Sequence, residues 1–405
     1  MHEVVITGIG MVTPLGGDLE SFSDAVMDGA SGIRSLETRF AGTLAAGLVT
    51  EDIDGAFDRG ELSLMDRASR LAVVAAGRAL EDAGSSSAMR RDMALFVGNG
   101  CGPAQFLSDS YEAFFTSGKC PPLTLLKCMQ NAPANHVTRR HGLHGPSHVV
   151  SAACASATIA IGETLHKIRH GYLDAAVVGG TESPFGDGLL KCWDALRVLA
   201  AADGADPRRT CKPFARRRGG IVLGEGAVFF VMESAAHARS RGARIKACLL
   251  GFGSSSDAAH MTEPAVAGQV QAMRAALADA GVPPQRISYV NAHGTATRVG
   301  DAVEAVSMRE VFNGDAVPWV SSTKAHHGHL LGASGAIELA ACIAALDRDG
   351  VPPTLNLDDP DPECALRHAA NEAVAHAGLD CVLSSSFAFG GMNACLVLRG
   401  GAVAH

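Results

Sequence analysis

A cysteine between a strand pattern and a helix pattern is the side chain best placed for covalent chemistry. A β-branched run ends at Val150, apolar residues recur at helical spacing from Ile159, and Cys154 lies between the two patterns. The first-turn N–H groups of such a helix lack partners, and the positive end of the helix dipole favours a thiolate. We therefore interpret Cys154 as a nucleophile toward a carbonyl carbon. A buried structural cysteine is the alternative, and for a lone cysteine in an apolar run it is the commoner role.

Polar residues follow three later strand patterns. His293 lies in the segment 291–297, Lys324 and His329 lie in 321–329, and a glycine-containing turn occupies 384–393. Proteins built from alternating strands and helices place their ligands at the carboxyl ends of strands. These clusters are therefore candidate functional residues, and their presence favours the nucleophile interpretation of the cysteine.

Three neighbouring histidines, His326, His327 and His329, raise the alternative of a metal site. Their spacing on one turn rarely gives a convergent ligand geometry, and no carboxylate or cysteine accompanies them, so we predict no metal. The early G-x-G at Gly8 and Gly10 lacks the third glycine and the helix start of a dinucleotide site. We found neither a P-loop nor a G-x-S-x-G elbow. We therefore predict no cofactor and disfavour nucleotide-dependent and serine-hydrolase activities.

The elements that position these residues are expected to alternate between strands and helices, which indicates an α/β fold with mostly parallel sheets. Strands are expected near residues 4–10, 94–98, 149–150, 175–180, 227–232, 246–253, 287–291, 317–321, 377–386 and 393–399, and helices near 64–83, 159–168, 234–241, 269–279, 300–312 and 332–347. The stretch from 106 to 144 is irregular and interrupted by proline, which is typical of a pocket or a subunit interface.

A repeated pattern divides the chain into two parts. Lys246–Gly253 repeats the strand-then-glycine pattern of Val4–Gly10. We therefore predict one half at residues 1–244, with the nucleophile, and a second at 245–405, with the histidines and the lysine. A chain of 405 residues with 47% hydrophobic and 19% charged residues exceeds one ordinary core, which fits two packed halves of a globular protein.

Composition also bounds location and partners. Eleven cysteines without a C-x-x-C pair indicate reduced thiols, and we expect a cytoplasmic protein. We expect no membrane association, because there is neither a signal-peptide pattern nor an apolar stretch long enough to span a bilayer. A net charge of −8 argues against nucleic acid. One basic cluster is an exception and is either a solvated loop or a surface for an acidic partner: Arg208, Arg209, Lys212 and Arg216, with Arg217 and Arg218.

Four motifs, in this order, carry a resemblance to a known family. They are SAACASA at 151–157, NAHGTAT at 291–297, STKAHHGHLLGASGAIE at 322–338 and FAFGGMN at 387–393. Together they resemble the β-ketoacyl-acyl-carrier-protein synthases, the condensing enzymes of the thiolase superfamily. Similar in pattern are the elongating enzymes of fatty-acid synthesis and the ketosynthases of type II polyketide systems, and the similarity covers nearly the whole chain.

The resemblance implies a thiolase-like α/β fold, in which two similar halves pack as α-β-α-β-α layers. It implies that Cys154 takes an acyl group from an acyl carrier protein and joins it to malonyl-acyl-carrier protein with loss of CO2. His293 and His329 would hold the malonyl thioester carbonyl and stabilise the enolate, and Lys324 would support both histidines. The backbone N–H groups of Cys154 and Phe389 would form the oxyanion hole.

The resemblance assigns further positions to architecture and gating. Asp301, Glu304 and Glu338 match acidic positions of the family. Glu338 is expected to pair with Lys324 or to order its surroundings. Phe389 is similar to a gating phenylalanine that separates the acyl tunnel from the malonyl site.

Two departures from the family pattern bear on the pathway. Ala388 stands where glycine is common, which restricts the backbone of the gating turn, and Asn291 stands where glutamate is common. Both favour a polyketide or polyene system over housekeeping fatty-acid synthesis. The rival function is a non-catalytic partner subunit that resembles the chain-length factors. Those partners typically lack the cysteine, so Cys154 argues against this alternative, and the two-histidine pattern argues against a thiolase.

Members of this family dimerise. The resemblance implies a homodimer, or a heterodimer with a chain-length-factor-like subunit, in which the strand Ala175–Val178 pairs across the two-fold axis. An acidic acyl carrier protein would dock on Lys212 and the neighbouring arginines of the basic cluster. Residues between Cys101 and Pro133 would line the acyl tunnel.

Overall fold

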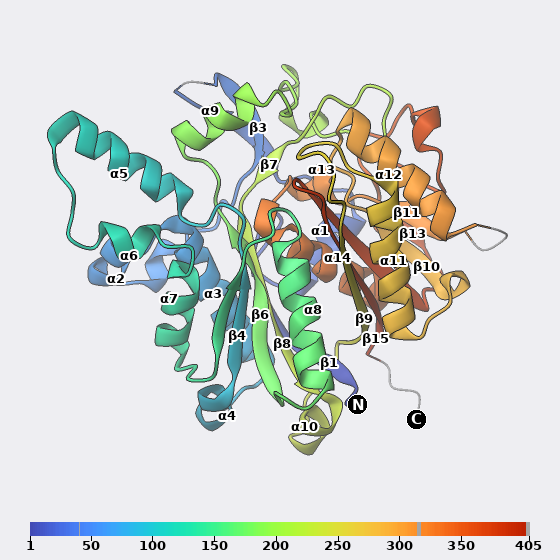
Figure 1. Cartoon of the computed structure of the whole chain (residues 1–405), viewed down its shortest axis with the longest axis horizontal. Helices are drawn as coiled ribbons and strands as arrows, with labels where there is room; N and C mark the ends of the chain where they lie inside the picture. The colour runs from blue at the N-terminus through green and yellow to red at the C-terminus, as the bar shows by residue number, and fades with distance from the viewer. Residues whose placement is uncertain (40, 314–316, 402–405) are drawn as a thin grey trace.

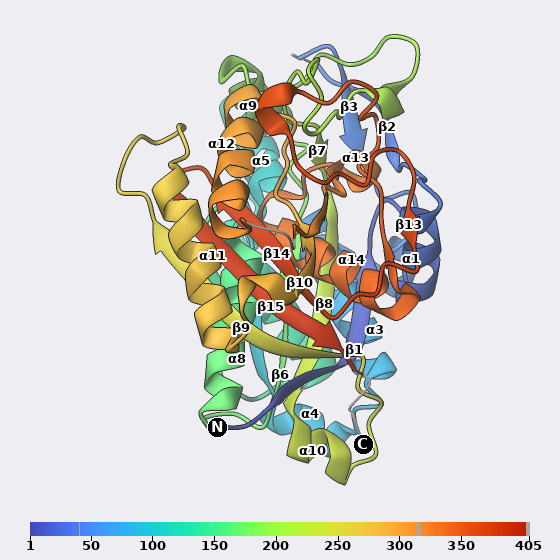
Figure 2. The same cartoon turned by 90° about the vertical axis from the view of Figure 1, so that its right-hand side faces the viewer.

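The computed structural model describes residues 1–39, 41–313 and 317–401, and its largest element is one twisted sheet of ten strands (Figure 1 and Figure 2). From one edge to the other, the strands are β11 (Trp319–Ser321), β10 (Ile287–Asn291), β14 (Cys381–Ala388), β15 (Met392–Gly400), β9 (Ala247–Ser256), β1 (Val4–Val12), β8 (Gly226–Ser234), β6 (Ala175–Glu182), β4 (Ala94–Gly98) and β5 (Ser147–Val150).

The sheet consists of two five-stranded groups with the same pairing pattern. In the N-terminal group, β4 is parallel to β5 and β6, whereas the β6–β8 and β8–β1 pairs are antiparallel. In the C-terminal group, β10 is parallel to β11 and β14, whereas the β14–β15 and β15–β9 pairs are antiparallel. Val4–Ile6 of β1 pairs with Ala247–Leu249 of β9 and joins the two groups. The prediction of mostly parallel sheets was wrong, because tight turns such as the one from β14 to β15 return the chain antiparallel.

Helices cover the outer faces of the two groups and fill the space between them. On one outer face α3 (Arg67–Asp82) packs on β1 and β8, and on the other α11 (Val266–Ala280) packs on β9 and β15. Between the groups lie α8 (Ser156–Arg169) and α14 (Ser334–Arg348), and α8 contacts β4 and β6 on one side and β9 and β15 on the other. This arrangement is the predicted α-β-α-β-α order of layers.

The two central helices approach each other at backbone distance. Every residue of α14 from Ser334 to Ala345 is buried, as expected for a helix that is apolar on all sides. A Cβ atom on Gly335 would lie 1.9 Å from Oγ1 of Thr158 in α8. Only glycine permits this contact, so the crossing of α8 and α14 fixes the distance between the two halves.

The remaining elements are shorter. The helices are α1 (Leu19–Met27), α2 (Arg59–Leu64), α4 (Ser87–Asp92), α5 (Ala104–Ser117), α6 (Thr124–Cys128), α7 (Ala132–His141), α9 (Asp187–Ala195), α10 (Ala235–Ser240), α12 (Arg298–Val311) and α13 (Lys324–His327), and the strands are β2 (Ile33–Glu37), β3 (Thr43–Gly47), β7 (Leu223–Gly224), β12 (Gly350–Val351) and β13 (Val374–Ala375). Among the described residues, no helix combines the length and the apolar character needed to cross a bilayer.

Two expectations about the periphery differ from the structure. The stretch from 106 to 144 contains α5, α6 and α7, and Pro133 lies in the first turn of α7, where proline is compatible with a helix. The strand expected to pair across a dimer axis, Ala175–Val178, belongs to β6, which is paired on both sides with β4 and β8. That expectation was wrong, because only a strand at a sheet edge has free backbone groups, and the edge strand of the N-terminal group is β5.

Candidate active site

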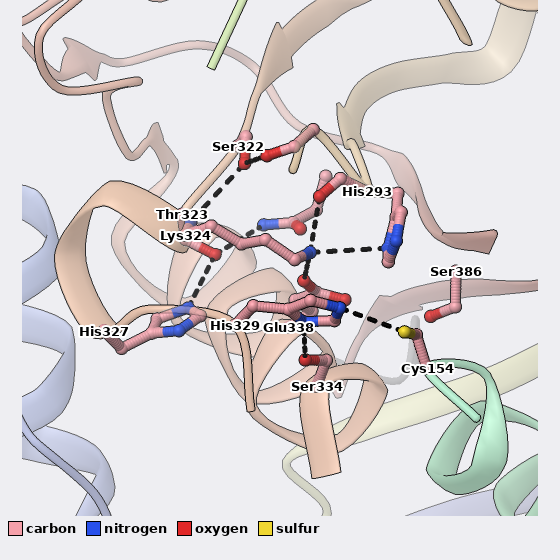
Figure 3. A network of polar contacts seen from close by, with 12 residues as sticks. Cys154, His293, Ser322, Thr323, Lys324, His327, His329, Ser334, Glu338 and Ser386 are labelled. Carbon is pink, nitrogen blue, oxygen red and sulfur yellow. Dashed lines mark hydrogen bonds and ion pairs between the residues drawn. The ribbon is translucent and has the colours of Figure 1, made fainter. Parts of the chain in front are cut away.

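Loops from both halves of the sheet meet above α14 (Figure 3). Cys154 follows β5, His293 follows β10, and His329 follows β11. The sulfur of Cys154 and the nearest ring nitrogens of the two histidines lie within 4.8 Å of one another, and all three side chains are buried. The structure therefore brings together residues that the sequence separates by more than a hundred positions.

A cavity of about 450 Å³ connects this cluster with the surface. Its inner wall includes Cys154, both histidines and Phe389, and its outer wall includes Met261 and Val299, which are 72% and 57% exposed. Two exposed arginines, Arg197 and Arg298, also line it, and sequence reasoning did not select them. A long substrate can therefore reach the sulfur from solvent past positively charged side chains.

A tight turn presents the cysteine. Ala153 has a φ of 47°, a left-handed conformation that a non-glycine residue rarely adopts. The hydroxyl of Ser156 stabilises the turn, because Oγ accepts from the N–H of Ala152 at 2.8 Å and donates to the carbonyl of Ala153 at 2.6 Å. Helix α8 starts immediately afterwards, as the sequence predicted.

The cysteine and one histidine are in direct contact. Nε2 of His329 lies 3.0 Å from Sγ of Cys154, and Nδ1 lies 2.7 Å from Oγ of Ser334. Burial raises the pKa of the Cys154 thiol to about 12, although the Lys324 charge and a hydrogen bond from the Phe389 N–H act to lower it. The resting side chain is therefore a thiol and not the expected thiolate, because removal of sulfur from water outweighs the helix dipole.

Both histidines of the cluster are neutral. Burial, followed by the positive charge of Lys324, holds the pKa of His293 and of His329 well below 6.5. A neutral imidazole next to a thiol can accept its proton. The two rings are nearly perpendicular, with centroids 5.3 Å apart, so both face the same part of the cavity.

Lys324 is a buried side chain that connects Glu338 of α14 with His293. Its Nζ donates to a carboxylate oxygen of Glu338 and to the backbone carbonyl of His293, and it lies 3.4 Å from Nδ1 of His293 (Figure 3). Glu338 is the partner expected from the sequence. Burial raises the pKa of Glu338 to about 7, and the lysine charge opposes this rise. The Nζ of Lys324 therefore contacts His293, whereas the Cys154 thiol contacts His329.

Two other acidic residues accept hydrogen bonds from backbone N–H groups. Glu304 accepts from the N–H groups of His293 at 2.7 Å and Gly294 at 2.8 Å, and burial raises its pKa to about 8. Asp301 accepts from the N–H of Phe214 at 2.7 Å, and burial raises its pKa to about 6. Neither carboxylate contacts the thiol, which is the geometry of an architectural role.

Phe389 lies at the start of the turn between β14 and β15. Its backbone N–H points at the Cys154 sulfur, and its half-buried ring stacks on Trp193 with centroids 6.1 Å apart. The left-handed conformations of the turn occur at Gly390 and Gly391, with φ of 82° and 74°. Ala388 has an extended conformation at the end of β14, so alanine there is compatible with the turn.

A buried carboxylate that sequence reasoning missed joins the loop after β4 to the segment before α14. Glu182, at the end of β6, accepts from the backbone N–H groups of Gly100, Gly102 and Gly332, at 2.7, 2.9 and 3.0 Å, and from that of Cys101. Burial raises its pKa to about 7, against the effect of these four donors. In the sequence it lies just beyond a predicted strand, and no local pattern indicates which loops it would join.

The other two neighbouring histidines face away from the cavity. The ring nitrogens of His326 contact the carbonyls of Ala30 and Pro353, and those of His327 contact Gly328 and Thr323. They do not form a cluster with His329. Cysteine and histidine are also metal ligands, so the absence of a metal at the Cys154 cluster stays a prediction.

The residues predicted to dock a carrier protein are exposed or half-buried, and each is paired. The ion pairs are Arg208–Asp206 at 2.8 Å, Arg209–Asp358 at 3.0 Å, Lys212–Asp203 at 3.8 Å and Arg216–Asp359 at 3.4 Å. Arg218 of the same sequence cluster is buried and paired with Asp361. Part of the positive charge of this surface is therefore offset within the chain.

Comparison with known proteins agrees with this geometry. The chain matches the family models of the beta-ketoacyl synthase N-terminal domain at residues 1–238 and C-terminal domain at 246–358. It is 40% identical to nodulation protein E of Rhizobium sp. (strain N33), over 98% of this chain and 99% of that protein. It is 37% identical to 3-oxoacyl-[acyl-carrier-protein] synthase 2 of Coxiella burnetii, over 98% of each.

Solved structures give the same result. The ishigamide ketosynthase/chain length factor superposes with a TM-score of 0.90 at 31% identity, over 98% of this chain and 99% of that one. Its likeness extends over both five-stranded groups and the helices between them, which confirms the thiolase-like fold. With a family model matched in each half, and a cysteine and two histidines converging at the inner end of one cavity, the chain belongs to the β-ketoacyl synthase family.

Proposed function

We propose that this chain catalyses decarboxylative condensation of an acyl thioester with malonyl-acyl-carrier protein, to give a β-ketoacyl-acyl-carrier protein in fatty-acid or type II polyketide or polyene biosynthesis. One observation carries the proposal: Cys154, His293 and His329 converge at the inner end of a cavity that is open to solvent. No cofactor is required for the reaction as written below.

The first half-reaction loads the acyl group. The Cys154 sulfur attacks the thioester carbonyl and its proton passes to Nε2 of His329, 3.0 Å away. The N–H of Phe389, which points at the sulfur, stabilises the negative charge on the carbonyl oxygen, with the N–H of Cys154 itself. The tetrahedral intermediate then releases the carrier thiolate, which takes the proton from His329 and leaves as a thiol.

The second half-reaction forms the carbon–carbon bond. Malonyl thioester loses CO2, and the electrons of the broken C–C bond form an enolate. Nε2–H of His293 faces this oxygen, because Nδ1 of that ring faces the Lys324 ammonium group, which can only donate. The enolate carbon attacks the acyl carbonyl on Cys154, the sulfur leaves as a thiolate, and a proton from water returns it to the resting thiol. Lys324 is a positioning residue here, since it acts through His293.

The partner-subunit alternative is disfavoured by the same geometry. A subunit that only shapes a tunnel needs no contact between a thiol and a neutral imidazole, as between Cys154 and His329. It also needs no buried lysine beside a second imidazole, as Lys324 lies beside His293. This chain has both features, the first at the cavity wall and the second directly behind it. The relatives named as 3-oxoacyl-acyl-carrier-protein synthases add support for a catalytic chain.

A second chain of the same fold is the proposed structural partner, either an identical copy or a chain-length-factor-like subunit. Strand β5 ends the sheet, and among the described residues it pairs with β4 alone. Next to it, α5 and α6 project from the body of the molecule (Figure 1). They expose an apolar surface formed by Tyr111, Phe114, Phe115, Leu125 and Leu126. An edge strand beside an exposed apolar patch is typical of a protein–protein interface.

The two halves, 1–244 and 245–405, remain the proposed division of the chain. The boundary between them falls between α10 and β9, and each half contains one five-stranded group. A cytoplasmic location is also proposed. It is supported by the eleven cysteines, all of which are free.

The carrier protein is proposed to approach the cavity mouth over Lys212, Arg208, Arg209 and Arg216. A Lys212→Glu variant should raise KM for carrier-bound substrate and leave the reaction with a short free acyl thioester unchanged. The reason is that Lys212, 28% exposed at its side chain, lies outside the reacting cavity. Equal loss with both substrates would contradict the docking proposal.

The reaction is tested by intact mass measurement with acyl- and malonyl-carrier proteins, with and without candidate partner chains. A thioester adduct that is absent in Cys154→Ala, followed by a product longer by two carbons, would support the proposal. Cys101→Ser is the matched control. It removes a neighbouring free thiol, and this variant should still form the adduct on Cys154. If no pairing gives an adduct, the chain acts as a scaffold instead.

A further inference from the structure

The buried histidines of this region differ in what their ring nitrogens contact. Nδ1 of His293 faces the ammonium group of Lys324, which only donates, so the proton of this neutral ring is on Nε2. Nδ1 of His327 faces the carbonyl of Gly328 at 2.7 Å, which only accepts, so its proton is on Nδ1. Both ring nitrogens of His326 face carbonyls, at 2.8 Å each. Each of these rings therefore contacts at least one group that can only donate or only accept a hydrogen bond, which we call a partner with a fixed role.

His329 has no partner with a fixed role at either nitrogen. Nδ1 contacts the hydroxyl of Ser334 at 2.7 Å, and Nε2 contacts the thiol of Cys154 at 3.0 Å (Figure 3). A hydroxyl donates one hydrogen bond and accepts others by rotation about its C–O bond, and a thiol also has both roles. The site therefore satisfies either tautomer of this one ring.

We propose that Ser334 is a positioning residue that lets His329 change tautomer between the two half-reactions. The inference rests on the proposed condensing function and adds a residue to it. In the first state the Nδ1–H donates to Ser334, and the Nε2 lone pair faces the thiol and takes its proton. In the second state the Ser334 hydroxyl donates to Nδ1, and Nε2–H faces the thioester or enolate oxygen. One ring thus acts as a base first and as a hydrogen-bond donor afterwards.

The proton balance of this change is neutral. During loading, the Cys154 proton passes to Nε2 and then to the departing carrier thiolate, so the ring returns to its starting form. The tautomer change is a separate step. One N–H bond breaks at Nδ1, one forms at Nε2, and water in the cavity exchanges the two protons. The charge of the ring is the same before and after, and no other reactant is consumed.

The fold holds the serine in a position that suits this role. Ser334 is the first residue of α14 and is fully buried, and the other described side chains give its Oγ no hydrogen bond besides that with His329. A backbone N–H in its place would only donate, and a carbonyl would only accept. Each would stabilise one tautomer and oppose the other.

The direct test is nitrogen NMR of protein labelled with 15N at histidine, before and after alkylation of Cys154 by iodoacetamide. Alkylation removes the thiol proton and places an amide oxygen in the cavity, so it stands in for the acylated state. We expect the proton of His329 to be on Nδ1 in the free protein and on Nε2 in the alkylated protein. The same tautomer in both states would overturn the proposal. His327 gives an internal reference that should not change.

Variants then connect the change to the hydroxyl. Ser334→Ala should slow acyl loading and malonyl decarboxylation by about 5- to 10-fold each, because both tautomers lose their Nδ1 partner. Ser334→Thr should restore both rates. A loss confined to one half-reaction would overturn the proposal, since the hydroxyl would then serve one tautomer only. Ser386→Ala is the matched control, because its hydroxyl is buried nearby but contacts Thr158, at 2.7 Å.

These measurements separate the inference from the function on which it rests. If wild-type protein neither loads an acyl group nor decarboxylates malonyl-carrier protein, the proposed function fails whatever the NMR spectra show. If it does both and the tautomer of His329 stays the same, the function stands and the role of Ser334 fails.

Discussion

The loops after β5 and after β11 occupy equivalent places in the two five-stranded groups, but they differ in length and in chemistry. After β5 the chain reaches α8 through residues 151–155, and the loop carries one reactive side chain, Cys154. After β11 it reaches α14 through residues 322–333, and this loop carries Lys324 and three histidines. The same position in the fold therefore holds the proposed nucleophile in one half and the groups proposed for charge stabilisation in the other.

The electrostatics of the two loops differ in the same way. Cys154 has no ion-pair partner, and burial keeps it a thiol. The Nζ of Lys324 donates to Glu338 and to a backbone carbonyl in the interior. Neither loop alone provides both a nucleophile and a means to stabilise an enolate. The site exists where α8 and α14 cross, so it belongs to the interface between the halves.

The largest effect is expected from removal of the buried cation. Lys324→Met leaves the Glu338 carboxylate buried without a partner, which should lower the free energy of unfolding by about 3–5 kcal/mol. Lys212→Met is the matched control and should cost at most about 1 kcal/mol, because its ion pair is half-exposed. Denaturant unfolding at pH 8 measures both. Equal costs for the two lysines would refute the contrast between the loops, and adding Glu338→Leu to the first variant should recover stability without activity.

The same variant should change the pH dependence of acyl loading. In the wild type, burial and the Lys324 charge lower the pKa of His329, so the ring stays neutral as pH falls through 6.5. Without that charge the pKa rises toward 6.5, and the ring takes up a proton as pH falls through the new value. Nε2 then has no lone pair for the Cys154 proton. As pH falls, loading by Lys324→Met should therefore begin to slow at a higher pH than loading by the wild type, although burial still keeps the pKa of His329 below 6.5. Superimposable profiles would show that the lysine does not act on this histidine.

A smaller effect is expected where the halves touch. Gly335→Ala adds a Cβ that would lie 1.9 Å from Oγ1 of Thr158, so α8 and α14 must separate. Unfolding free energy should fall by about 1–3 kcal/mol, and acyl loading should slow because the 3.0 Å contact between Cys154 and His329 lengthens. Adding Thr158→Ala should recover part of both. A variant with lower stability but unchanged loading would mean that the crossing does not set the catalytic distance.

The smallest effect concerns the cysteine turn alone. Ser156→Ala removes the hydroxyl that bonds the backbone of Ala152 and Ala153, and about 1 kcal/mol of stability should be lost. Loading should slow a few-fold while malonyl decarboxylation keeps its rate, because the C-terminal loop is untouched. Separate half-reaction assays check this, with exposed Ser147→Ala as the control. A parallel loss of decarboxylation would show that the two loops are not independent.

The residues of the candidate site could be selected from the sequence because each lies in a local motif. His293 and His329 follow strands in short, distinctive segments, and Cys154 lies between a strand pattern and a helix pattern. The layered α/β fold followed from the alternation of elements. What local patterns cannot give is which strands lie side by side, and this is why β6 was placed at the dimer axis although β5 is the edge strand.

Other misses have the same origin. Ser334 fell within a predicted helix and Glu182 lay just beyond a predicted strand, and only the folded chain brings Ser334 to His329 and Glu182 to the loop after β4. Helices α5, α6 and α7 lie in a stretch whose prolines predict interruptions, but Pro133 lies in the first turn of α7, where proline is compatible with a helix.

The bare edge of β5 has a consequence for handling the protein. A recombinant chain made without the proposed partner presents, among the described residues, unpaired N–H and C=O groups of β5 and exposed aromatic side chains of α5 to every other copy in the preparation. Self-association should therefore rise with concentration, and yield should depend on which gene is co-expressed. A preparation made with the correct partner should stay monodisperse at concentrations where the chain alone precipitates.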